Sequence, residues 1–143
     1  MNQENILDFK IQISEKEEKR IKDLIPVIIG GNTEQMLLTA ERIGTYLGQE
    51  LPKKERLYIH QIRRVFGMIK RIQMDSFDTK KLALLKPHMV FIATKGDATM
   101  GIQYLKDILI EAIDNIGQEE IRFENFIDFF ESILAYHQAA EKI

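Results

Sequence analysis

Apolar residues recur along most of the chain at the three- and four-residue spacing of amphipathic α-helices. The clearest case is residues 54–74, where one side of the predicted helix is apolar and is therefore expected in the core: Tyr58, Ile62, Val65, Phe66, Ile69 and Ile72. The same spacing predicts four further helices, over residues 32–48, with Asn32 as the cap, 79–96, 99–116 and 119–141. Runs with the two-residue alternation of strands are too short to predict a sheet. The pattern predicts an all-α protein, a single-domain bundle of five to six helices over residues 1–143.

The N-terminal part of the chain has a weaker pattern. Residues 1–13 alternate without a strong helical face, so we expect an arm that is either extended or caps the bundle. Ser14 and Glu17 have the spacing of a capping box, which predicts that a short helix begins there. Pro26 and the Gly30-Gly31 pair should disrupt or end that helix.

The last predicted helix is more apolar than a helix on the surface needs to be. One set of its residues has core spacing: Phe123, Phe126, Phe130, Ile133 and Leu134. Ile127 and Phe129 lie outside this stripe. They indicate either a central position in the bundle or a contact with another subunit.

The formal net charge of −2 conceals a strong segregation of charge. Residues 53–86 carry ten Lys or Arg against three Asp or Glu. Residues 1–52 carry six against nine, and residues 87–143 carry four against ten. A basic segment in an otherwise acidic protein predicts a local site for a polyanion. The alternative is that these cations pair with the acidic segments of the same molecule.

The sequence lacks the residues that several kinds of functional site require. The sequence has no cysteine, which excludes disulfides, thiolate metal sites and a cysteine nucleophile, and we expect a protein of the cytoplasm. The start has no leader pattern and the longest apolar run contains Pro26, so we expect no contact with a membrane. The three histidines lack partners at metal-site spacing, and neither a phosphate loop nor a nucleophile elbow occurs. We therefore expect no metal, no cofactor and no enzymatic activity, with acid–base chemistry by carboxylates of the last two helices as an alternative.

The cations of residues 54–74 lie on the side of the predicted helix opposite the apolar one: Arg56, His60, Arg63, Arg64, Lys70 and Arg71. Like charges at these spacings repel, so the face is unfavourable unless an anion covers it. The planar fork of arginine suits phosphate oxygens. Lys86 and Lys95 on the following helix, with Lys80 and Lys81 at its start, would widen the basic surface. The alternative is a face that is simply solvated.

Two features beside this face bear on what it binds. Gly67 lies near its centre, although glycine inside a helix costs about 1 kcal/mol relative to alanine. Either a side chain there would hold a nucleic-acid backbone or a partner helix away, or the glycine is tolerated at an exposed site. Exposed aromatic side chains would add base stacking, but we expect the nearest candidates, Tyr58 and Phe91, in the core.

Three segments follow one another in a characteristic order. They are His60-Gln61-Ile62-Arg63-Arg64-Val65-Phe66, then Leu85-Lys86-Pro87-His88-Met89-Val90-Phe91-Ile92-Ala93, then Phe126 through Phe130-Glu131-Ser132-Ile133-Leu134-Ala135-Tyr136-His137. Together they resemble the small helical subunit of the type III-A CRISPR interference complex. The resemblance covers residues 55–140 and leaves the role of residues 1–54 open.

This resemblance implies a non-catalytic, RNA-binding subunit that is present in several copies, stacked as an inner filament beside the backbone subunits that carry the guide. Its partners would be the guide RNA and target RNA, the backbone and large subunits, and further copies of itself. The residues it implies for RNA phosphates are Arg63, Arg64, Lys70, Arg71 and Lys86. With the rest of the basic face and Lys95 beside it, the RNA-binding residues that we predict are Arg56, His60, Arg63, Arg64, Lys70, Arg71, Lys86 and Lys95. The alternative is a helical dimerisation or adaptor module whose basic stripe binds an acidic protein partner.

Overall fold

The computed structural model describes the backbone of residues 3–142 and the side chains of residues 16–142. Within these residues the elements are helical: α1 (Gln3–Ile29), α2 (Thr33–Thr45), the π-helical turn η1 (Tyr46–Glu50), the 3-10 turn η2 (Lys53–Glu55), α3 (Ile59–Asp75), α4 (Thr79–Ala93), α5 (Met100–Asp114) and α6 (Glu120–Glu141). No strand occurs in residues 3–142, so the prediction of an all-α bundle of five to six helices is confirmed.

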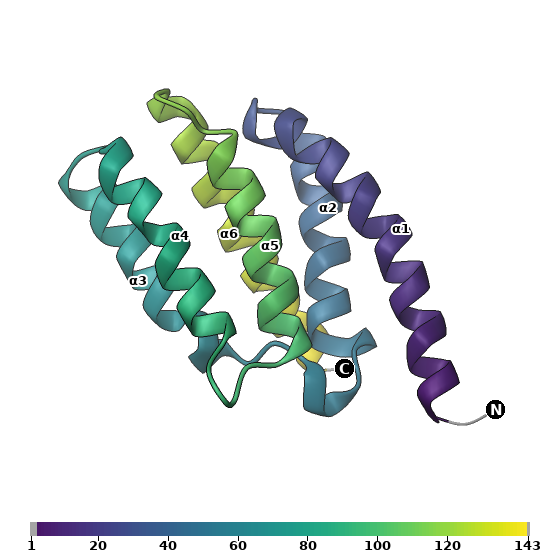
Figure 1. Ribbon diagram of the computed structural model, residues 1–143. Helices are drawn as coiled ribbons and strands as arrows, with labels where there is room; N and C mark the ends of the chain where they lie inside the picture. Colours follow the sequence, from purple (N-terminus) through teal and green to yellow (C-terminus); the bar gives the residue numbers. More distant parts are fainter. Residues whose placement is uncertain (1–2, 143) are drawn as a thin grey trace.

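The helices form two layers of three (Figure 1). α4, α5 and α1 lie in front of α3, α6 and α2 in this view, and α5 contacts both of its neighbours in the front layer. The hairpin of α3 and α4 stands at one edge of the bundle, and α1 and α2 stand at the other. The helix that carries the predicted basic face, α3, therefore lies at the edge of the bundle farthest from α1 and α2.

α6 is the central helix of the core. It contacts α1, α2, α5 and η1, and its phenylalanines are at most 2% exposed: Phe123, Phe126, Phe129 and Phe130. Ile127 is also buried, at 2% exposure. Because Ile127 and Phe129 are covered by their own chain, they reflect a central position in the bundle, as the first of the two interpretations predicted. Burial of each such side chain contributes about 1.5–3 kcal/mol.

α2 packs directly against the backbone of α6 at Gly44, where no side chain separates the two helices. A Cβ atom added to Gly44 would lie 2.6 Å from Cβ of Tyr136 and 2.7 Å from the backbone nitrogen of His137. Backbone atoms cannot rotate away from such a contact, so any side chain at Gly44 would separate the two helices. The segment of α6 that carries Tyr136 and His137 is thus packed against the end of α2.

Arg42 joins α1, α2 and η1. Its guanidinium contacts Glu17 through two nitrogens, at 2.7 and 2.6 Å, and also pairs with Glu50. Burial alone would lower the pKa of Arg42, but its hydrogen bonds to Glu17 and Glu50 outweigh this effect and raise that pKa above its usual value. The Arg42 guanidinium thus joins the three elements by pairing with one carboxylate from α1 and one from η1.

The expected boundary at Ser14 is wrong. Residues 3–13 are the first turns of α1, and the helix continues without interruption to Ile29. Residues 1–25 contain neither glycine nor proline, so nothing in the sequence breaks the backbone hydrogen bonds there, and the capping-box spacing occurs inside a helix. Pro26 is tolerated near the end of α1, on its exposed side. The part of the predicted arm at residues 1–2 lies outside the described residues.

The other predicted boundaries hold to within a few residues, with one exception. Gly31, at φ 115°, ends α1, and Asn32 caps α2 by accepting a hydrogen bond from the backbone of Gln35 at 3.0 Å, as predicted. α3, however, begins at Ile59 and not near residue 54. Residues 56–58 are extended, because Leu57 is buried and its N–H donates to the carbonyl of Leu47 at 3.1 Å. This tertiary contact overrides the helical pattern of the sequence.

Candidate nucleic-acid interface

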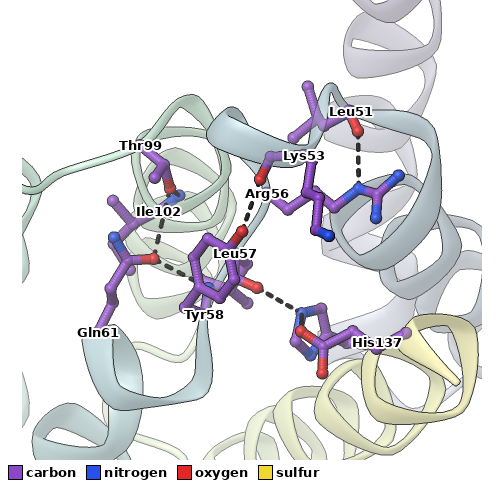
Figure 2. A network of polar contacts seen from close by, with 10 residues as sticks. Leu51, Lys53, Arg56, Leu57, Tyr58, Gln61, Thr99, Ile102 and His137 are labelled. Carbon is purple, nitrogen blue, oxygen red and sulfur yellow. Dashed lines mark hydrogen bonds and ion pairs between the residues drawn. The ribbon is translucent and has the colours of Figure 1, made fainter.

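The start of α3 is fixed by a buried polar network (Figure 2). Gln61 is 8% exposed, and its side-chain oxygen accepts from the backbone N–H of Tyr58 at 3.0 Å and from the hydroxyl of Thr99 at 3.3 Å. Its amide nitrogen donates to the carbonyl of Asp97 at 3.1 Å. The first turn of α3 is thus tied to the first turn of α5, which begins beyond Thr99.

His137 holds the segment before α3 from the other side. Its ring is fully buried, and Nε2 donates to the carbonyl of Leu57 at 2.7 Å (Figure 2). Together with the Gln61 network, this hydrogen bond sets the direction in which α3 leaves the core. These contacts tie the start of α3 to α5 and to α6.

Three arginines of α3 form the bare basic face: Arg63, Arg64 and Arg71. All three are exposed, and no hydrogen bond or ion pair joins them to any residue among those the structure describes. Gly67 lies between them on the exposed side, and a Cβ atom added there would meet nothing within 4 Å. This part of the predicted helix face is open to solvent, with an unhindered backbone at its centre.

The remaining predicted RNA-binding cations of the α3–α4 hairpin have partners within the protein. Lys70 is half-buried and pairs with Glu131 of α6, and its ammonium group lies 5.4 Å from the centre of the Phe66 ring. Lys86 pairs with Asp114 of α5. The interpretation that acidic segments of the same molecule neutralise the basic one is thus true of these two lysines. Exposed pairs of this kind contribute about 0–1 kcal/mol, so an anionic ligand could displace them at modest cost.

Two further candidates near the start of α3 contact other groups of the protein. Arg56 does not belong to α3, because that helix begins at Ile59; its guanidinium donates to the carbonyls of Leu51 at 2.8 Å and Gln49 at 2.9 Å. The prediction that Arg56 shares the helix face is wrong. Its guanidinium N–H groups instead donate to backbone carbonyls of the segment that precedes α3. His60 is exposed on α3, with Nε2 at 3.6 Å from the carboxylate of Asp97.

The expectation that Tyr58 and Phe91 lie in the core is wrong. Phe91 is 61% exposed on α4, and the ammonium group of Lys95 lies 5.5 Å from the centre of its ring. Tyr58 is 36% exposed, and its hydroxyl donates to the carbonyl of Lys53 at 2.6 Å. The aromatic groups that base stacking would require are thus present at the surface. The pattern of α4 could have indicated this for Phe91, because its buried positions follow another stripe: Leu82, Leu85, Met89 and Ile92.

Within residues 16–142, no group of three or more His, Asp or Glu side chains is placed to hold a metal ion. None of the helices in the part of the chain that the structure describes combines the length and the apolar composition of a membrane span.

The chain was compared with known proteins. A family model described as Csm2 Type III-A matches residues 32–142, so the likeness begins at α2 and is wider than the predicted range of 55–140. Neither the curated proteins nor the solved structures contain a match. Because the family model covers well over half of the sequence, the chain belongs to the Csm2 family, whose members are small helical subunits of the type III-A CRISPR effector complex.

Proposed function

We propose that this chain is a non-catalytic RNA-binding subunit of the type III-A complex, and that its bare basic face holds RNA by the phosphate backbone. The observation that carries the proposal is that Arg63, Arg64 and Arg71 are exposed together on one helix, without partners among the residues that the structure describes. Three uncompensated charges on one face repel one another, and an anionic strand removes that repulsion. Phosphate contacts position a strand without reading its sequence, so specificity would come from pairing between guide and target.

The wider basic surface supports the same proposal. Phe91 on α4 and Lys95 offer an exposed ring and a cation side by side, although Lys95 lies in the turn after α4 and not on the helix where it was predicted. Lys70 and Lys86 could exchange their carboxylate partners for phosphates. In this proposal the chain works in the cytoplasm, in several copies stacked as the inner filament beside the guide-bearing backbone subunits, and nuclease and signalling chemistry belong to other subunits.

The test is the affinity of the full chain for single-stranded RNA, measured by fluorescence anisotropy. Changing Arg63, Arg64 and Arg71 together to alanine removes three contacts, each of which releases about 0.7 counterion. At physiological salt this corresponds to about 0.8 kcal/mol per contact, or a loss of affinity of about 50-fold for the three.

A charge-matched control keeps the result interpretable. Lys16, Lys19 and Arg20 are exposed on α1, at the opposite edge of the bundle, and their replacement by alanine removes the same charge. We expect this control variant to bind RNA within about twofold of the wild type. Equal losses in both triple variants would show that only net charge matters. Tighter binding of polyglutamate than of RNA of equal charge would favour the rival function, an adaptor for an acidic protein.

A further inference from the structure

An apolar groove runs between α3 and α6, beside the bare basic face. Its volume is about 360 Å³, at the lower end of the roughly 300–1,000 Å³ of small-ligand sites. Ile62 and Phe66 of α3 form one wall, and Leu134 and Ala135 of α6 form the other. Phe66 and Leu134 are only half-buried, so apolar surface is left open to an occupant.

The rim of the groove is polar and positively charged. Arg63 lines it on the α3 side and Gln138 on the α6 side, and both are exposed. Arg63 is also one of the three arginines of the bare basic face. Glu131, which also lines the groove, pairs with Lys70, so an ion pair joins α6 to α3 beside it. The groove thus combines an apolar floor with a guanidinium and an amide that can donate to polar edges.

We propose that this groove receives one unstacked nucleobase of the RNA strand that the bare basic face holds, an inference that rests on the proposed function. The occupant must present an apolar face to Phe66 and Leu134 and belong to an anionic molecule that pairs with Arg63. A nucleobase meets both conditions, because its flat face is apolar while its sugar is attached to phosphate. Its polar edge would lie against Gln138 and Arg63, whose donors reach the carbonyl oxygens and ring nitrogens of bases.

The test fills the groove without touching any arginine. Ala135→Leu combined with Gln138→Leu places two large side chains on the α6 wall, whereas Ala83→Leu combined with Gln103→Leu makes the same exchanges at exposed positions of α4 and α5 that do not line the groove. Each full-length variant is titrated with single-stranded RNA and with inorganic polyphosphate, which carries the charge but no base. We expect the groove variant to bind RNA at least about fivefold more weakly than the control variant, in line with the loss of one stacked base, and to bind polyphosphate equally well.

A second measurement locates the base directly. RNA containing 4-thiouridine, crosslinked to the wild type by light and mapped by peptide mass spectrometry, should attach to Phe66 or Leu134, and these crosslinks should disappear in the groove variant. Unchanged RNA affinity in the groove variant, equal losses for RNA and polyphosphate, or crosslinks only outside the groove would overturn the inference. Such results, together with a loss of RNA affinity on removal of the three arginines, would leave the proposed function standing and assign the groove to an apolar segment of a protein partner. If removal of the arginines is also without effect, the proposed function itself fails.

Discussion

Replacing Gly67 by alanine and measuring the free energy of unfolding tests whether this side of α3 is open to solvent. An added Cβ atom would meet nothing within 4 Å, and the residue lies in the middle of a helix with an ordinary negative φ. The substitution therefore carries no steric cost, and it removes the unfavourable helix propensity of glycine, about 1 kcal/mol. We expect the variant to be more stable by about that amount, which raises the Tm by about 3–5 °C for a chain of this size.

Gly101 provides the matched control, since the same substitution there should act in the opposite direction. A Cβ atom at Gly101 would lie 2.4 Å from the backbone nitrogen of Leu57 and 2.8 Å from the carbonyl carbon of Arg56. Backbone atoms cannot yield as a flexible side chain can, so we expect a loss of about 3 kcal/mol. Both variants are measured by urea denaturation followed by far-ultraviolet circular dichroism. A destabilising Gly67→Ala would refute the open, helical surface on which the bare basic face depends.

The same Gly67 variant separates the two explanations for glycine in the centre of the face. If the RNA backbone approaches Gly67 closely, alanine should weaken RNA binding while stabilising the protein. If the glycine is merely tolerated, the stability should rise and the RNA affinity should stay unchanged. We expect the first result, because Gly67 lies on the same exposed side of α3 as the three arginines.

Three further predictions concern single side chains. His137→Phe should lower the free energy of unfolding by about 1–3 kcal/mol in urea denaturation, because it leaves a buried carbonyl before α3 without its donor; unchanged stability would contradict the role of that hydrogen bond. Burial, with carboxylates nearby, raises the pKa of the Tyr104 phenol above its ordinary value of about 10. The neutral, buried phenol therefore contributes its full share to the free energy of unfolding below pH 10, and this contribution is lost as the pH rises through the raised pKa. Ultraviolet titration at alkaline pH should show one tyrosine that ionises late, and Tyr104→Phe should remove it; loss of an early-ionising group instead would contradict this assignment. Lys70→Met should weaken RNA binding less than Arg71→Met in anisotropy titrations, since only Lys70 already has a carboxylate partner, and the reverse order would count against the distinction between paired and bare cations.

Much of the fold followed from the spacing of apolar residues. The stripes of α3, α5 and α6 are strongly periodic, and the residues that define them are buried. The start of α3 did not follow, because residues 56–58 are held extended by contacts with the end of α2 and with His137, and such contacts have no signature in local periodicity. Likewise, capping-box spacing at Ser14 marks a helix start only where the preceding residues cannot continue the helix.

The candidate site was predictable in part. Periodicity placed Arg63, Arg64 and Arg71 on one exposed face, as the structure has them. It could not show that Lys70 and Lys86 pair with α6 and α5, because these partners are 61 and 28 residues away in the sequence and meet only through the packing of the helices. The groove between α3 and α6 was missed for the same reason.

If the bare basic face of α3 neutralises RNA phosphates, the affinity for RNA must depend on salt through Arg63, Arg64 and Arg71. The logarithm of the association constant for single-stranded RNA is measured against the logarithm of salt concentration for the wild type and for the variant lacking Arg63, Arg64 and Arg71. We expect the slope to become shallower by about 2, at about 0.7 for each of three lost phosphate contacts. An unchanged slope in a variant that retains its helical circular dichroism would show that these arginines do not contact RNA phosphates.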